Sequence, residues 1–315
     1  MQISVVIPLF NEAESLPELM QWIDRVMQTH NYSYEVIMVD DGSKDNSWNT
    51  IQTLRASYPS LKGIKFQRNY GKSAALNEGF KMSQGDIVVT MDADLQDSPD
   101  EIPEFYDMIT KEGYHLVSGW KKKRYDNTFT KNIPSKIYNA VARRSSGIVL
   151  HDFNCGLKVY RAEVVKSIEV FGEMHRYIPI LAKWAGFKRI GEKVVQHQAR
   201  KYGTTKFGWE RFVNGFLDLM TIQFLSKFGK KPMQFFGLIG SLFFLIGLIS
   251  FGNIVFDKFM NPDFSVTNKP AFYIALVSMI IGVQLFLAGF IAELVNRSAV
   301  DRNNYLIEDK LGFNS

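Results

Sequence analysis

Residues 3–12 read Ile-Ser-Val-Val-Ile-Pro-Leu-Phe-Asn-Glu, and this stretch decides the fold. The run at 3–7 is short, mostly apolar and β-branched, which is typical of a strand. Two polar residues, Asn11 and Glu12, follow its end. Pro8, which lies between the apolar run and these polar residues, is either a strand terminator or part of a binding site. The stretch predicts a core strand with ligand-binding side chains beyond its carboxyl end.

The same pattern repeats along the first half of the chain. Strand-like runs at 34–39, 63–66 and 87–91 alternate with helical patterns at 12–28, 45–57 and 72–82. This alternation predicts an α/β domain with a mostly parallel, doubly wound, Rossmann-like sheet. Ligands of such sheets bind beyond the carboxyl ends of the strands. The less regular middle is predicted to add strands at 115–120 and 156–160 and a helix near 134–144.

Acidic residues follow three of these strands, at 11–12, 40–43 and 92–94. Any one cluster could be a helix cap or a turn. Three of them surround one crevice with negative charge, and a divalent cation is the natural bridge to an anionic ligand. Asp92 and Asp94 offer the hard oxygen ligands that Mg²⁺ or Mn²⁺ prefers. The pattern predicts a metal site there, with turn chemistry as the alternative.

The last third of the chain changes in character. Residues 233–256 and 271–292 contain no charged residue, and each run exceeds the roughly 20 apolar residues that span a bilayer. One run could be a buried core helix, but two runs around a polar loop predict a transmembrane hairpin. The predicted divisions are an α/β domain at 1–206, an amphipathic interfacial helix at 207–231, a hairpin at 232–296 (spans about 233–256 and 271–295) and a cytoplasmic tail at 297–315.

Basic residues flank the predicted hairpin: Lys227, Lys230 and Lys231 before it, Arg297 and Arg302 after it. By the positive-inside rule both flanks face the cytoplasm. We expect no signal peptide, and the single cysteine, Cys155, excludes an intramolecular disulfide. The expectation is a multi-pass protein of the inner (plasma) membrane with a cytoplasmic α/β domain. The net charge of +5 could suit nucleic acid. The basic side chains lie beside the predicted spans, however, where anionic lipid headgroups are the nearer partner, so we expect no nucleic-acid binding.

Three motifs carry a resemblance to a known family. The segments 4–12, 39–45 and 92–97 look like the signatures of the family 2 glycosyltransferases, which have the GT-A fold. The resemblance is narrowed to the polyprenyl-phosphate glycosyltransferase branch by the two spans and by residues 68–76, Arg-Asn-Tyr-Gly-Lys-Ser-Ala-Ala-Leu. The resemblance implies an inverting, metal-dependent transfer of a hexose from a nucleotide-sugar, UDP-glucose being favoured, to a polyprenyl (undecaprenyl) phosphate. The product would serve cell-envelope glycosylation, with Mg²⁺ or Mn²⁺ as cofactor.

The resemblance also implies roles for individual residues. Asp41 would hydrogen-bond the base, Asp92 and Asp94 would hold the diphosphate and the metal, and Gln96 would lie near the sugar. The implied nucleotide-sugar site comprises Pro8, Asn11, Glu12, Asp41, Gly71, Lys72, Asp92, Ala93 and Asp94. The implied catalytic group is Asp92, Asp94, Gln96 and Asp152, of which Asp152 has the least certain role.

Two later segments concern the acceptor. Residues 152–161 resemble the family's D-x-x-[ST]-G-[FL]-[KR] segment, but Cys155 replaces the small hydroxyl residue and Lys158 stands where arginine is frequent. Residues 197–207 resemble an R-x-x-G-x-[ST]-K segment that closes over phosphate. The implied acceptor-phosphate residues are Arg200, Thr205, Lys206 and Lys158; a solvated basic loop is the alternative. His197 is as compatible with a structural as with a functional role.

A phosphate acceptor sets the expected mechanism. A hydroxyl acceptor needs a general base, whereas a lipid phosphate has a second pKa near 6 and arrives already anionic. Positioning and stabilisation of the leaving group should then dominate catalysis. The alternatives are the same reaction with GDP-mannose or another UDP-sugar, a processive polysaccharide synthase, and a catalytically silent membrane-tethered nucleotide-binding module. The sequence leaves open whether the chain forms a homo-oligomer.

Overall fold

The computed structural model describes residues 1–122, 142–143, 146–198, 201, 224, 232–261, 265–298 and 307–312. The chain divides into two compact units. The first comprises Met1–Met220 together with Asn303–Ser315, and the second comprises Thr221–Arg302. Each unit is described by itself.

The first unit is built on one mixed sheet. Its strands are β1 (Ile3–Leu9), β2 (Tyr34–Asp40), β3 (Leu61–Phe66), β4 (Ile87–Thr90), β5 (Leu116–Trp120), β6 (Lys158–Arg161), β7 (Ile190–Val194) and β8 (Ile307–Leu311). They lie in the order β7-β5-β6-β4-β1-β2-β3-β8. The expected parallel arrangement holds for β4, β1, β2 and β3 and for the pair β5 and β7. β6 and β8 are antiparallel to their neighbours, so the sheet as a whole is mixed.

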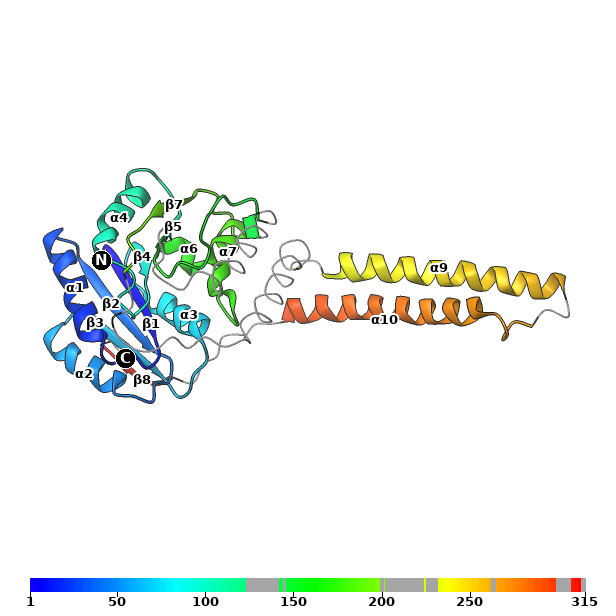
Figure 1. Ribbon diagram of the computed structural model, residues 1–315, viewed down its shortest axis with the longest axis horizontal. Helices are drawn as coiled ribbons and strands as arrows, with labels where there is room; N and C mark the ends of the chain where they lie inside the picture. Colours follow the sequence, from blue (N-terminus) through cyan, green and yellow to red (C-terminus); the bar gives the residue numbers. More distant parts are fainter. Residues whose placement is uncertain are drawn as a thin grey trace. The chain divides into compact units, whose positions relative to one another are not determined.

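Helices cover both faces of this sheet (Figure 1). They are α1 (Leu16–Thr29), α2 (Ser47–Ser57), α3 (Lys72–Met82), α4 (Ile102–Thr110), α6 (Ala162–Lys166) and α7 (Ile178–Trp184), with 3₁₀ turns η1 (Pro99–Glu101) and η2 (Met174–Tyr177). Val5 of β1 packs in one core cluster with residues of α1 and α4, whereas its neighbour Val6 packs on the opposite face with α3. Side chains alternate across a strand, so an unbroken apolar run such as 5–7 fills both cores.

The helix boundaries follow local turn chemistry. α1 begins at Leu16 rather than at the expected residue 12, because Ser15 N donates to Glu12 O (3.1 Å) and closes a turn ahead of Pro17. α3 has the predicted bounds. The helix expected near 134–144 lies almost entirely outside the described residues.

The parallel strands bring the three acidic clusters to one edge of the sheet. In the register of the sheet, Leu9 pairs with Asp40, and Val6 pairs with Thr90. Parallel neighbours end on the same side, so the residues after β1, β2 and β4 meet there. The predicted meeting of these motifs is therefore confirmed at the level of the fold.

Two strands have no counterpart in the sequence-based prediction. β7 pairs with β5, and β8 pairs with the outer edge of β3, where Gly63 faces Leu311 and Lys65 faces Asp309. The region expected to be a plain tail after the hairpin therefore contributes a strand to the sheet of the first unit. An added strand covers backbone groups that an open edge would expose.

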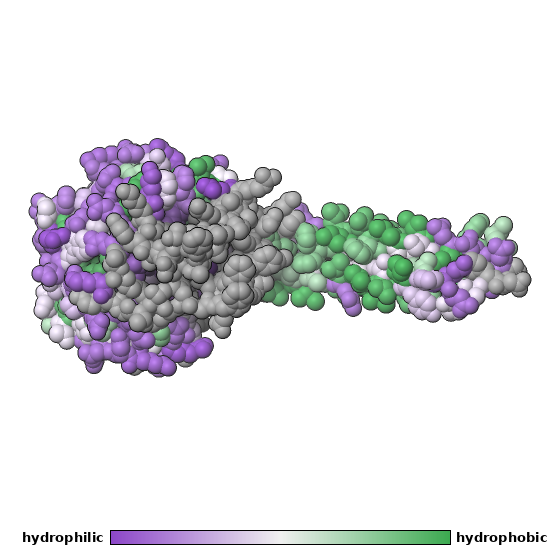
Figure 2. All heavy atoms as spheres, viewed as in Figure 1, coloured by the Kyte–Doolittle hydropathy of each residue, from purple (hydrophilic) through white to green (hydrophobic). Residues whose placement is uncertain are grey.

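The second unit is a helical hairpin of α9 (Pro232–Met260) and α10 (Pro270–Ser298). Both helices are long and apolar enough to cross a membrane, and hydrophobic residues cover most of their visible surface (Figure 2). Glycines bring the two backbones close: a Cβ on Gly240 would lie 2.6 Å from Gly282 O, and one on Gly247 would lie 2.7 Å from Ala275 O. Small residues at the contact are typical of helices that associate in lipid. The interfacial helix expected at 207–231 lies outside the described residues except for Phe224.

Candidate active site

The loops after β1 and β2 are fastened to each other. Asn11 N donates to Ser43 Oγ (2.9 Å), and the Asn11 side-chain oxygen accepts from Lys44 N (2.8 Å). Asn11 adopts a left-handed backbone conformation with φ of 55°, which asparagine tolerates better than most residues. Glu12 N donates to Ser47 Oγ (3.0 Å). The predicted nucleotide-site residues Asn11 and Glu12 are thus held by the loop that contains Asp40 and Asp41.

Asp41 holds the segment before α3. Its two carboxylate oxygens accept hydrogen bonds from Tyr70 N (2.6 Å) and Gly71 N (2.9 Å). Burial raises the pKa of Asp41 to about 6, although both hydrogen bonds act in the opposite direction. At Gly42, with φ of 70°, a Cβ would lie 2.5 Å from the carbonyl carbon of Arg68. The motifs at 40–43 and 68–76, which are far apart in the sequence, therefore form one loop cluster.

Lys72 and Asp92 form an ion pair across this cluster. Lys72 is the first residue of α3, and its Nζ lies 2.5 Å from Asp92 Oδ1. Burial acts to raise the pKa of Asp92, but Lys72, Lys121 and Lys158 outweigh it and lower that pKa to about 2. Asp92 is therefore ionised at neutral pH, which is the state in which a carboxylate binds a metal.

The start of β6 lies against Asp92. A Cβ on Gly156 would lie 2.5 Å from Asp92 Oδ2, so only glycine leaves room for this carboxylate. Two residues on, Lys158 is 3% exposed and donates to the Cys155 carbonyl oxygen. Burial lowers the pKa of Lys158 and raises that of the Cys155 thiol to about 12. The segment 152–161 thus supplies a buried cation and an unreactive thiol beside the predicted metal ligand.

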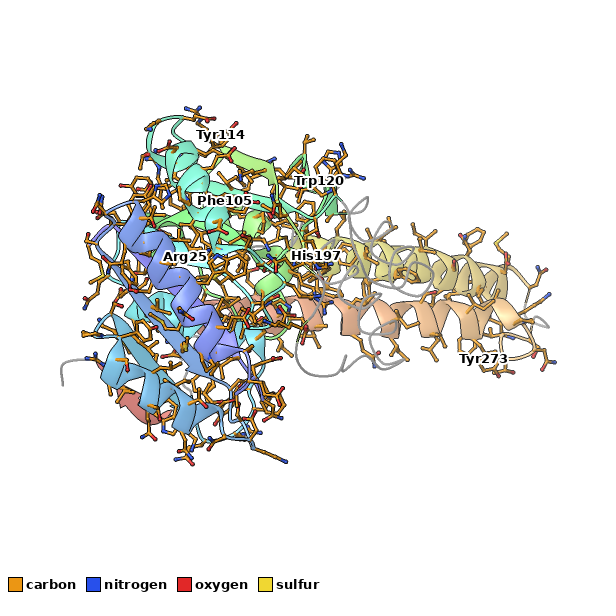
Figure 3. All side chains as sticks on the ribbon, turned by 60° about the vertical axis from the view of Figure 1, so that its left-hand side comes forward. Arg25, Phe105, Tyr114, Trp120, His197 and Tyr273 are labelled. Atoms are coloured by element: carbon orange, nitrogen blue, oxygen red, sulfur yellow. The ribbon has the colours of Figure 1, made fainter. Side chains whose placement is uncertain are left out.

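The turn after Asp94 is joined to the segment that leads to the predicted acceptor loop. Leu95 has φ of 61°, and Gln96 N donates to Asp94 Oδ1 (3.2 Å). Gln198 N donates to Gln96 O (3.1 Å), and His197, labelled in Figure 3, forms an isolated antiparallel bridge with Asp97. The backbone at His197 therefore has a structural role.

Asp97 and Asp152 are both buried and held by neighbouring residues. Asp97 is fully buried and pairs with Lys121 Nζ at 2.6 Å. Asp152 is 2% exposed, its Oδ1 accepts from Asn154 N (3.0 Å), and its own N–H donates to Glu192 Oε1 (3.1 Å). These bonds fix the turn that precedes Cys155 and Gly156, and the predicted catalytic role of Asp152 stays a prediction.

One partly open pocket gathers several of the predicted residues. Its lining includes Pro8, Lys72, Asp92, Gly156 and Lys158. The predicted site residues Asn11, Glu12, Asp41, Asp94, Gln96 and Asp152 are not part of this lining. Arg200, Thr205 and Lys206 lie outside the described residues, so their predicted role in acceptor binding stays a prediction.

The pocket also contains two residues that sequence reasoning missed. His175 and Arg176 lie on η2 and line the pocket together with Thr90, the last residue of β4. Ser73 Oγ lies 3.0 Å from His175 Nδ1 and accepts from His175 N (3.0 Å). Residues 171–176 read Phe-Gly-Glu-Met-His-Arg and show neither a strand period nor a helix period. The only signal available was an adjacent pair of basic side chains in an irregular segment.

The residues present fit a divalent cation that is shared with a ligand. Asp92 and Asp94 provide two carboxylates, and among the described residues no third acid, histidine or cysteine groups with them. Mg²⁺ usually binds to one or two carboxylates together with substrate phosphates and water. An ion that is held jointly with a diphosphate is therefore compatible with this site.

The fold and the site define the class of the protein: it is a glycosyltransferase with a GT-A-like fold. Residues 4–169, more than half of the chain, match the family described as "Glycosyl transferase family 2", and the chain belongs to that family.

Curated relatives are named as sugar transferases that act with polyprenyl phosphates. A dodecaprenyl-phosphate galacturonate synthase from Rhizobium johnstonii is 33% identical, covering 95% of this chain and 88% of the relative. An undecaprenyl-phosphate 4-deoxy-4-formamido-L-arabinose transferase from Shewanella sediminis is 34% identical, covering 98% of this chain and 92% of the relative. The predicted branch of the family is thus confirmed by its relatives.

Solved structures share the fold. Glucosyl-3-phosphoglycerate synthase from Mycobacterium tuberculosis, in complex with Mn²⁺ and UDP-glucose, is 20% identical with a TM-score of 0.55; the match covers 72% of this chain and 79% of that one. Mannosyl-3-phosphoglycerate synthase from Rubrobacter xylanophilus is 16% identical with a TM-score of 0.55, covering 72% and 75%. At this level of identity the likeness concerns the fold.

Proposed function

We propose that this protein transfers a sugar from a nucleotide-sugar to a polyprenyl phosphate, with inversion at the anomeric carbon. The observation that carries the proposal is the placement of Asp92 beside two cations, Lys72 and Lys158, in one pocket. Among the described residues that line this pocket, Asp92 is the only acid. A carboxylate suits a metal-bound diphosphate donor, and cations suit an anionic acceptor.

The donor would lie along the loop cluster after β1, β2 and β4. Pro8, Asn11, Glu12 and Asp41 would hold the nucleoside, with Asp41 on the base, and Gln96 would lie near the sugar. Asp41 already positions Gly71, so one carboxylate would organise both the base site and the start of α3. Asp92 and Asp94 would hold Mg²⁺ or Mn²⁺, which when bound neutralises the charge of a departing nucleoside diphosphate.

The transfer needs no proton to be removed from the acceptor. A phosphate oxygen of the lipid would attack the anomeric carbon while the bond from that carbon to the nucleoside diphosphate breaks. The new carbon–oxygen bond forms on the opposite face, and the nucleoside diphosphate leaves with the electron pair. The chain's contribution is then to bring the two anions together and to screen their repulsion.

The identity of the sugar is the finer part of the proposal. UDP-glucose is the first donor to test, because residues 95–97 and the hairpin resemble those of the bacterial polyprenyl-phosphate glucosyltransferases. The relatives are named for galacturonate and 4-deoxy-4-formamido-L-arabinose, so nucleotide-activated forms of both belong in the same panel.

The path of the chain supports a two-span arrangement in the inner membrane. β8 pairs with β3, so residues 307–311 must lie on the same side of a membrane as the rest of the α/β unit. The chain leaves that unit near residue 220 and re-enters it near 303. An even number of crossings must lie between, and α9 and α10 supply two. We propose that the shared side is the cytoplasm, because basic residues flank the hairpin.

The experiment is an assay of the full-length enzyme in detergent with undecaprenyl phosphate and a panel of nucleotide-sugars. Transfer of sugar from at least one donor to the lipid phosphate is the expected result. A chain that binds nucleotide but transfers no sugar from the panel would instead be the silent nucleotide-binding module.

A further inference from the structure

The pocket beside Asp92 is more cationic than donor binding alone requires. Lys72 comes from the start of α3, Lys158 from the start of β6, and Arg176 from η2. Three elements that are far apart in the sequence thus direct basic residues into one partly open pocket. The enclosed interior is about 20 Å³, room for about one water, so a larger polar group would lie at the open mouth of the pocket.

The surroundings of Lys158 favour a bound anion. Its side chain is buried, and within the described part of the chain its ammonium has one hydrogen bond, to the Cys155 carbonyl oxygen. An ammonium has three N–H donors, and leaving such groups buried without acceptors is unfavourable. Two carboxylates, Asp152 and Asp92, act on Lys158 through their charge, and Asp92 is already paired with Lys72. An oxyanion in the pocket would supply the acceptors that Lys158 lacks.

Arg176 is held beside this pocket by a specific clamp. His175, its neighbour on η2, interacts with Ser73 Oγ through both its backbone N and its ring Nδ1, each at 3.0 Å. Ser73 follows Lys72 on α3, so the clamp fixes Arg176 close to the Lys72–Asp92 pair. The Arg176 side chain is 17% exposed, and its guanidinium lies 3.5 Å from Glu173 at the more exposed rim.

The charges of the pocket suit an anion with about two negative charges. Lys72, Lys158 and Arg176 against Asp92 leave a net charge of +2. Burial, with Lys72 and Arg176 nearby, lowers the pKa of His175 well below its usual value, so that its ring adds no charge. A phosphate monoester carries about −1.5 to −2 near pH 7, whereas each phosphate of a sugar-linked diphosphate carries about −1.

We infer that this pocket binds the phosphate monoester of the lipid acceptor and that Arg176, held by the Ser73–His175 clamp, is one of its phosphate-binding residues. The inference rests on the proposed function, because it takes the acceptor to be a polyprenyl phosphate. It places the acceptor phosphate within reach of Lys158 and next to Asp92, where the donor's diphosphate would bind. It also gives η2 a role that no sequence motif suggested.

The test compares two phosphate sources on the full-length enzyme in detergent. Geranyl phosphate is the acceptor-side probe, geraniol its neutral match, and UDP with Mn²⁺ the donor-side probe; calorimetry gives each affinity. Arg176→Ala should weaken geranyl phosphate binding about tenfold to a hundredfold, because a charge-assisted contact is lost. UDP affinity should not change. In turnover, KM for the lipid phosphate should rise more than kcat falls.

Matched variants guard against a folding artefact. Arg25→Ala removes an exposed arginine of α1 that pairs with Asp100 and should leave both affinities unchanged (Figure 3). Arg176→Lys keeps the charge without the planar fork and should recover part of the affinity. Ser73→Ala removes the hydroxyl group of the clamp and should weaken geranyl phosphate binding, although Lys72, Lys158 and Arg176 all remain.

Two results would overturn the inference: unchanged geranyl phosphate binding in a folded Arg176→Ala protein, or an equal loss of UDP affinity, which would assign the cation to the donor. Failure of the proposed function looks different, because the wild-type enzyme would then bind geranyl phosphate no better than geraniol.

Discussion

Lys72 Nζ lies 2.5 Å from Asp92 Oδ1, so the carboxylate proposed to hold a metal is paired with a lysine of α3. Both side chains are about one-third exposed, and the pair lies at the edge of the pocket. A metal that binds Asp92 must compete with this ammonium. Lys72 would then be released towards the donor's phosphates, where a flexible point charge is useful.

The first prediction concerns this competition. Lys72→Met should raise the affinity of the donor-free enzyme for Mn²⁺, measured by electron paramagnetic resonance, because Asp92 loses its competing cation. The same variant should lower kcat/KM for the nucleotide-sugar about tenfold to a hundredfold, since a charged contact to phosphate is lost. Lys111→Met, which breaks an exposed pair with Asp107, is the matched control. A decrease in Mn²⁺ affinity would show that Lys72 supports metal binding rather than opposing it.

The second prediction concerns the metal ligands. Asp92→Asn and Asp94→Asn should each reduce turnover by about two orders of magnitude or more while the domain stays folded, as expected for loss of a charge that stabilises the transition state. Chelation by EDTA should have the same effect and be reversed by Mg²⁺ or Mn²⁺. Asp107→Asn, at an exposed position of α4, serves as the control. Full activity in the chelator would remove the metal from the mechanism.

The third prediction follows from the pKa of Asp41, which burial raises to about 6. Below that pH the protonated carboxyl can no longer accept both backbone N–H groups of Tyr70 and Gly71, so nucleotide affinity should fall. The stability contribution has the opposite sign. The folded protein binds this proton more tightly than the unfolded chain, so the contribution of Asp41 to unfolding free energy grows as pH falls from about 6 towards 4.

Asp41→Asn tests both effects. The amide has one acceptor oxygen in place of two, so the donor KM should rise about tenfold. The acid limb of the pH profile of nucleotide binding should disappear, and the melting temperature of the variant should depend less on pH between 4 and 6 than that of the wild type. An acid limb that is unchanged in the variant would assign it to another group, such as Asp40.

The fourth prediction concerns topology. With Cys155 replaced by serine, a cysteine at Thr267, in the exposed loop between α9 and α10, should react with a membrane-impermeant thiol reagent added outside intact cells. A cysteine at Ser57, at the exposed end of α2, should react only after lysis. Reaction of the Ser57 probe from outside would reverse the proposed orientation.

The strands and helices of the first half of the chain could be predicted well from the sequence, because the patterns that indicate them are local. Runs such as 3–7 and 87–91 are apolar on both faces, and the polar residues after them mark the edge where ligands bind. The register that brings Leu9 beside Asp40 follows from parallel pairing and needs no further information. The sequence showed 40–43 and 68–76 only as two motifs of one family. The structure shows why they lie together: the Asp41 carboxylate accepts hydrogen bonds from Tyr70 N and Gly71 N.

The features that were missed depend on distant partners. The segment 307–311, Ile-Glu-Asp-Lys-Leu, is short and charged, and it becomes a strand because β3 offers an open edge. His175 and Arg176 are functional candidates only because Ser73 holds η2 against α3, a contact across 102 residues. Lys158 was expected to be an acceptor residue, but neither its burial nor the close approach of Gly156 to Asp92 could be predicted from the sequence. Long-range packing of this kind leaves no period in the sequence.

The most direct test of the central claim is an acceptor comparison. The purified full-length enzyme is given one productive nucleotide-sugar and either undecaprenyl phosphate or undecaprenol, and the glycolipid formed is quantified by mass spectrometry. We predict a sugar-phosphate-lipid product with undecaprenyl phosphate and none with the alcohol, because the phosphate oxygen arrives anionic and Lys158 and Arg176 of the pocket would bind it. Equal glycosylation of undecaprenol would contradict the account, since the acceptor would then be a hydroxyl group and the cations would have another purpose.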